Sequence, residues 1–151
     1  MGAVLFYHLT RSPAETVVGS LLPRALAQGW RVAIRGGDAA RLARLDDWLW
    51  LNPDDGFVPH GRSGGPDDAR QPVLLTTDSG MPNRPQALLA LDRAEVAPEE
   101  AAALQRVWVL FDAGDAAAME HARTQWRRLR AAGSTLEYWS EESGRWVQQK
   151  L

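Results

Sequence analysis

The feature of this sequence that most constrains its fold is an alternation of two kinds of segment along the chain. Short runs of strand-forming apolar residues are separated by longer stretches in which apolar residues recur at helical spacing. Strands alternating with helices indicate an α/β fold with a mostly parallel sheet. The predicted strands are Ala3–His8, Trp30–Arg35, Pro72–Thr77, Ala87–Leu91, Val107–Phe111, Leu136–Trp139 and Arg145–Gln148. The first predicted helix begins at Ser12 and ends at Gly29. The other two predicted helices span Asp38–Leu51 and Asp115–Ala132.

The start of the first helix carries a local signal. Ser12 stands at the capping position, Pro13 in the first turn, and Glu15 at the capping-box position. Farther along, Gly61–Gln71 is rich in Gly, Pro, Asp and Arg and is predicted to be a loop. The chain shows no internal repeat and no linker, so we expect residues 1–151 to form one domain.

The composition excludes several classes of protein. The chain has no cysteine, which excludes disulfide scaffolds, cysteine zinc sites and thiol catalysis. Its net charge is −2, with 17 basic and 19 acidic residues, so it has no polybasic arm for nucleic acid. No apolar run reaches the roughly 18 residues of a membrane span, and the first residues lack the features of a signal peptide. We therefore expect a cytoplasmic protein that does not contact a membrane.

A search for catalytic or cofactor-binding motifs finds none. Gly36-Gly37 follows a predicted strand and precedes a helix, but no glycine-rich phosphate-binding motif is present. No nucleophile elbow occurs, and the three histidines lie far apart without carboxylates at ligand spacing. His60 has no partner close in sequence, so a structural or interface role is favoured for it over that of a general base. We expect no catalytic residue, no metal and no cofactor.

The strongest local cluster is a stripe on the last predicted helix. At about 100° per residue, Arg123, Trp126, Arg127 and Arg130 share one side, with Met119 at the upstream end. The opposite side should face the sheet through Ala118, Ala122, Leu129 and Ala132. Two interpretations remain open: a solvated face whose aromatic ring packs on a neighbour, or a site for an acidic peptide with an apolar end or for single-stranded nucleic acid. The negative net charge argues against nucleic acid.

A second cluster contains Trp50 and Phe57. Trp50 ends a helix and lies off its core stripe of Leu42, Leu45 and Leu49, and Phe57 follows a turn-forming segment. The two aromatic rings either form an exposed apolar patch or fold back onto the core.

Several segments together resemble the chi subunit of the bacterial DNA polymerase III holoenzyme. The most specific block runs from Leu45-Asp46 to His60 and includes Gly56-Phe57-Val58-Pro59-His60. The other matching segments are Phe6-Tyr7-His8-Leu9, Gly29-Trp30-Arg31-Val32, Arg44-Leu45-Asp46-Asp47-Trp48-Leu49-Trp50, Gln71-Pro72-Val73-Leu74-Leu75, Asp112-Ala113-Gly114-Asp115, and the helix from Ala122 to Gly133.

This resemblance implies a three-layer α/β/α Rossmann-like fold without a nucleotide, and an adaptor rather than an enzyme. Chi subunits bind the psi subunit of the clamp loader and the acidic C-terminal tail of single-stranded DNA-binding protein, so DNA is contacted only indirectly. By position, Arg123, Trp126 and Arg127 match the residues that bind the tail, while Met119 replaces a family cation. Arg130 is added from helical geometry alone.

By the same resemblance, Trp50 and Phe57 match the positions that hold psi and, in some members, a repair helicase. The alternative is a Rossmann-like enzyme or nucleotide-binding domain with a cryptic site. Such a protein should have a deep pocket with converging titratable groups at the carboxyl ends of its strands, whereas an adaptor should have shallow surface grooves lined by arginine and aromatic side chains.

Overall fold

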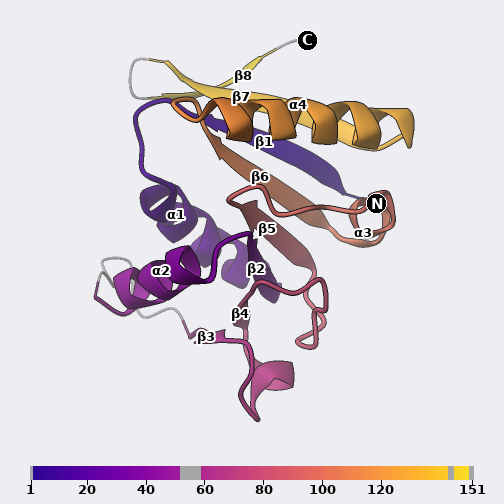
Figure 1. Ribbon diagram of the computed structural model, residues 1–151. Helices are drawn as coiled ribbons and strands as arrows, with labels where there is room; N and C mark the ends of the chain where they lie inside the picture. The colour runs from indigo at the N-terminus through magenta and orange to yellow at the C-terminus, as the bar shows by residue number, and fades with distance from the viewer. Residues whose placement is uncertain (1, 52–58, 143–144, 150–151) are drawn as a thin grey trace.

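The computed structural model describes residues 2–51, 59–142 and 145–149, and it confirms an α/β architecture (Figure 1). The strands are β1 (Ala3–Leu9), β2 (Val32–Gly36), β3 (Gly61–Arg62), β4 (Val73–Thr76), β5 (Ala87–Leu91), β6 (Arg106–Asp112), β7 (Thr135–Glu142) and β8 (Arg145–Gln149). The helices are α1 (Ala14–Ala27), α2 (Ala39–Leu51), α3 (Pro98–Ala103) and α4 (Ala116–Ala131), with a short 3-10 turn η1 at Asp68–Arg70.

All the strands belong to one sheet with the order β3-β4-β2-β5-β6-β1-β7-β8. Every pairing is parallel except that of β7 with β8, which forms an antiparallel edge. The central strands β2, β4 and β5 are buried at every position. Their continuous apolar sequences are typical of a parallel sheet that is covered on both faces.

Two apolar layers confirm the three-layer arrangement. Alternate residues of β1 point to opposite faces, so Leu5 and Leu9 join the core beneath α1 and α2, while Val4 and Phe6 join the core beneath α3 and α4. Helix α4 contacts β6 and β7, and α2 contacts β2 and β4, so the two layers of helices cover different parts of the sheet (Figure 1). The face of the sheet beneath α4 carries the aromatic side chains that line the candidate site.

The predicted capping box of the first helix is wrong. Helix α1 begins at Ala14, its capping residue is Pro13, and no side chain caps it. The Ser12 hydroxyl instead donates a 2.6 Å hydrogen bond to Glu141 Oε2, and Glu141 Oε1 accepts from the backbone N–H groups of residues 10–12. Burial alone would raise the pKa of Glu141, but these hydrogen bonds outweigh it and lower the pKa. A partner from the end of the chain therefore replaces the local cap.

Three short elements are absent from the prediction. The expected loop Gly61–Gln71 contains β3 and η1, and a helix that the patterns did not indicate, α3, follows β5. Helix α3 is tied to the sheet by the buried Arg35, which donates to both carboxylate oxygens of Glu100, at 2.9 and 2.7 Å. A bidentate pair of this kind fixes orientation as well as distance.

Candidate functional site

The face of α4 that packs on the sheet was predicted almost correctly. Ala118, Ala122 and Leu129 are buried as expected, but Ala132 is exposed and Gln125 takes the remaining buried place. Gln125 can be buried because its amide exchanges two hydrogen bonds with the backbone of Val96, at 3.2 and 2.7 Å. The burial of this face determines which side of α4 points away from the sheet.

A groove of about 320 Å³ lies along α4, where the helix meets the strands β1, β6 and β7. The structure brings Arg123, Trp126 and Arg127 together in it, with Met119 at one end. Arg130 is exposed but is not among the residues that line the groove. The complete lining is Phe6, Phe111, Met119, Ala122, Arg123, Trp126, Arg127 and Tyr138.

The floor of the groove is aromatic. Trp126 is half-buried and meets Phe6 and Tyr138 edge-on, with ring centroids 5.1 and 6.0 Å apart. The Tyr138 hydroxyl lies 2.9 Å from Nδ1 of His8, whose ring stacks on Phe111 at a centroid distance of 5.1 Å. Burial lowers the pKa of His8, which favours its neutral form. These ring contacts form an apolar floor on which the apolar end of a ligand can pack.

The rim of the groove is cationic. Arg123 and Arg127 are largely exposed, and each has a guanidinium nitrogen 3.7 Å from a carboxylate oxygen of Glu120. Burial raises the pKa of Tyr138, and the nearby charge of Arg123 acts in the opposite direction. Two guanidinium groups beside an aromatic floor suit a ligand with a carboxylate next to an apolar group.

Sequence reasoning missed Phe6, Phe111, Tyr138 and Glu120 as neighbours of the stripe. The aromatic residues stand on three strands that are far apart in sequence, and only the order of the strands in the sheet brings them beneath α4. Glu120 carried a usable signal, because it precedes Arg123 by three residues on the same helix.

The second predicted cluster is exposed where the structure describes it. Trp50 is 51% exposed and the adjacent Leu51 is 78% exposed. Phe57 lies outside the described residues. Beneath Trp50 lies the ring of His60, at a centroid distance of 4.7 Å, and Nε2 of this buried histidine is 3.1 Å from Oδ1 of Asp46. His60 thus has a structural partner that its sequence neighbourhood did not reveal.

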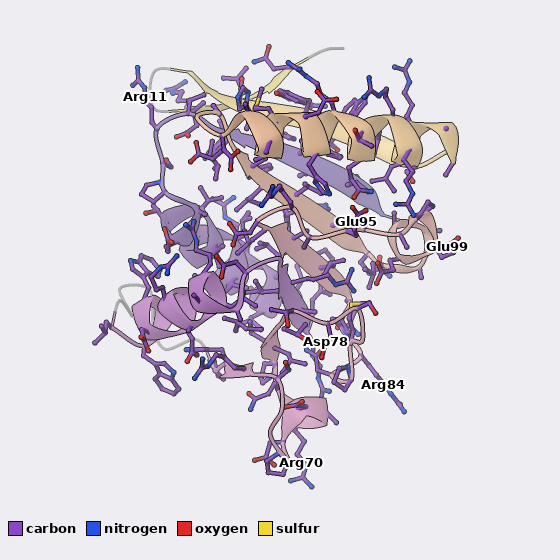
Figure 2. All side chains as sticks on the ribbon, in the orientation of Figure 1. Arg11, Arg70, Asp78, Arg84, Glu95 and Glu99 are labelled. Atoms are coloured by element: carbon purple, nitrogen blue, oxygen red, sulfur yellow. The ribbon has the colours of Figure 1, made fainter. Side chains whose placement is uncertain are left out.

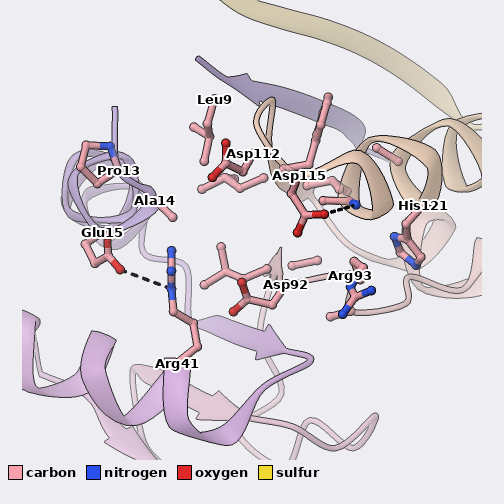
Figure 3. A pocket seen from close by; sticks show the side chains of 18 of the residues that line it. Leu9, Pro13, Ala14, Glu15, Arg41, Asp92, Arg93, Asp112, Asp115 and His121 are labelled. Atoms are coloured by element: carbon pink, nitrogen blue, oxygen red, sulfur yellow. Dashed lines mark hydrogen bonds and ion pairs between the residues drawn. The ribbon is translucent and has the colours of Figure 1, made fainter. Parts of the chain in front are cut away.

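A third hollow, of about 350 Å³, lies at the carboxyl ends of β1, β5 and β6 (Figure 3). This is where open α/β sheets bind ligands. Most of its charged side chains already have partners: Glu15 pairs with Arg41 at 3.3 Å, Asp115 caps α4, and His121 lies 3.0 Å from Glu95. Asp92 differs, because its Oδ2 is buried without a hydrogen-bond partner in the described structure, and burial raises its pKa.

Within the described ranges, no group of three or more His, Asp or Glu side chains is placed to hold a metal ion. No helix in the same ranges combines the length and the apolar character that crossing a membrane requires.

Comparisons of the sequence with known proteins identify its family. The sequence profile of the family described as DNA polymerase III chi subunit, HolC, matches residues 1–137. A probable DNA polymerase III subunit chi of Rickettsia prowazekii (strain Madrid E) is 23% identical over 91 residues, which are 60% of this chain and 55% of the relative. The chain thus spans little more than half the length of that relative. Because the profile covers residues 1–137, this chain belongs to the DNA polymerase III chi subunit family.

Proposed function

We propose that this protein is a non-catalytic adaptor that binds the acidic C-terminal tail of single-stranded DNA-binding protein in the groove along α4. The observation that carries the proposal is the placement of Arg123 and Arg127 at the rim of a groove with an aromatic floor. The family resemblance implies a tail that ends in phenylalanine, so that its α-carboxylate and its phenyl ring both belong to the last residue. One guanidinium group binds the α-carboxylate through two parallel hydrogen bonds, and the phenyl ring packs beside Trp126.

On the other side of the adaptor, we propose that the surface formed by Trp50 and Leu51 binds the psi subunit of the clamp loader. Phe57 is assigned to the same interface from the family resemblance alone. A half-exposed tryptophan that is supported from below by a buried side chain is a typical anchor at a protein interface. A repair helicase that uses the same surface would compete with psi.

Titration calorimetry with an acidic peptide ending in phenylalanine tests the groove. The affinity should fall with added salt, because exposed charges are screened beyond about 10 Å at 0.1 M. Arg123→Ala should weaken binding by about 2–3 kcal/mol if Arg123 holds the carboxylate. Arg130→Ala is the matched control, since it removes the same charge from the same helix outside the groove.

The peptide with a C-terminal amide should bind as weakly to the wild type as the free acid binds to Arg123→Ala. An affinity that does not change with salt concentration would place the tail elsewhere on the surface. An Arg123→Ala protein that binds the peptide like the wild type would lead to the same conclusion.

The hollow at the carboxyl ends of the strands supports a second candidate, a small-molecule or nucleotide site. We rank it lower because the charged side chains around it, other than Asp92, are mostly committed to contacts within the protein. Thermal stabilisation by a nucleotide that disappears in Asp92→Ala would favour this candidate.

A further inference from the structure

A separate recess of about 210 Å³ lies between the second half of α1 and the strands β1 and β6. Two guanidinium groups line it, those of Arg24 and Arg106, and no carboxylate does. Its walls are aromatic, and its complete lining is Tyr7, Leu21, Arg24, Ala25, Gln28, Trp30, Arg106 and Trp108. In a protein whose net charge is −2, a recess with this lining is a local concentration of positive charge.

Neither guanidinium group is neutralised from within the described part of the chain. No ion pair joins Arg24 or Arg106 to an acidic side chain there, whereas Arg35, Arg41 and the two arginines of the groove each have one. Nε of Arg106 is moreover buried and has no hydrogen-bond partner in the same residues. A buried donor without a partner is costly, and a bound anion would satisfy it.

The Arg106 guanidinium group packs against an aromatic ring rather than a carboxylate. Its guanidinium carbon lies 6.0 Å from the centre of the Trp30 ring, within the range of a cation–π contact. The Tyr7 ring stacks on Trp146 at 4.8 Å, and its pKa is raised by burial while Arg24 and Arg106 act to lower it. The two arginines therefore act on one phenol from the same recess. The acid in this neighbourhood, Glu137, accepts a 3.1 Å hydrogen bond from the Trp139 indole.

We propose that this recess binds a nucleotide phosphate, with the oxyanion between Arg24 and Arg106 and the attached nucleoside against the aromatic wall. The planar, fork-like guanidinium groups match phosphate oxygens, and the indole wall suits a base. A free nucleotide and the 5′-phosphorylated end of a single strand present the same chemistry. The recess is distinct from the groove along α4, because the two share no lining residue.

The first test is a titration with deoxyadenosine monophosphate, followed by calorimetry and by the indole N–H signals in NMR spectra. We expect saturable binding that shifts the Trp30 signal, and no binding of deoxyadenosine. Arg106→Gln should weaken binding about tenfold, the factor expected for loss of one charge-assisted hydrogen bond. Because Arg106 is partly buried, Arg24→Gln at an exposed position provides a second variant that keeps the fold.

Arg11→Gln is the matched control. Arg11 is an exposed arginine on the loop after β1, beyond the carboxyl end of that strand (Figure 2). Arg106 begins β6 and pairs with Ala3 at the opposite, amino end of β1. The Arg11→Gln protein should bind the nucleotide like the wild type. A 5′-phosphorylated oligonucleotide identifies the source: tighter binding than the mononucleotide indicates a strand end, and equal binding indicates a free nucleotide.

Two results would overturn the proposal. One is the absence of nucleotide binding, including the case in which an acidic peptide alone binds and depends on Arg106. The other is nucleotide binding that survives both Arg106→Gln and Arg24→Gln, which would place the nucleotide at the carboxyl ends of the strands instead.

Discussion

The indole ring of Trp126 meets the ring of Phe6 edge-on, with the two centroids 5.1 Å apart. Trp126 therefore packs on the core as well as lining the groove. We expect Trp126→Ala to lower the free energy of unfolding by about 2–4 kcal/mol, because it deletes a large, partly buried ring. Trp126→Phe should recover part of that loss. Denaturant unfolding measures both, and an unchanged midpoint for Trp126→Ala would mean that the ring contributes to the groove alone.

Glu120 should compete with the ligand of the groove. Its carboxylate lies 3.7 Å from both Arg123 and Arg127, so an acidic peptide must displace it. Glu120→Gln should tighten peptide binding by up to about fivefold, because an exposed ion pair contributes about 1 kcal/mol or less. Glu99→Gln, on α3, makes the same change in net charge away from the groove. Calorimetry should show tighter binding in Glu120→Gln than in Glu99→Gln, and equal affinities would exclude the competition.

The surface around Trp50 should be independent of the groove. Trp50→Ala should abolish co-purification with the psi subunit and lower the Tm only slightly, because the side chain is already 51% exposed. Phe57→Ala should do the same, since a central aromatic anchor contributes about 2–4 kcal/mol to binding. Both proteins should bind the acidic peptide normally. A loss of peptide affinity in either would show one merged site, and unfolding of Phe57→Ala would place Phe57 in the core.

Asp92→Asn should stabilise the protein at neutral pH. Burial raises the pKa of Asp92 in the folded state, so its contribution to stability is full below the ordinary aspartate pKa and is lost as the pH rises through the raised value. Asparagine removes that loss and tolerates the positive φ of 50° at this position. The Tm should rise at pH 7 and match the wild type below about pH 4. An unchanged Tm at pH 7 would mean that Asp92 has compensating contacts when charged.

How much the sequence could predict depends on the distance between interacting residues. The strand Ala87–Leu91 was predicted to the residue, and the buried face of α4 to within one exchange, Gln125 for Ala132. Local periodicity suffices for both, since the period of a helix or strand is set by neighbouring residues. The stripe of Arg123, Trp126 and Arg127 was recognised for the same reason.

Contacts between distant segments were decided by the tertiary structure alone. Tyr138 and His8 meet across 130 residues, and Ser12 finds its hydrogen-bond partner Glu141 at a separation of 129. No local pattern carries such pairings, because they depend on the order in which parallel strands join the sheet. The sequence by itself therefore determined the longer helices and strands, the outer face of α4 and the family resemblance. The sheet order decided that Phe6, Phe111 and Tyr138 lie beside Trp126, where these aromatic residues form a groove together with Arg123 and Arg127.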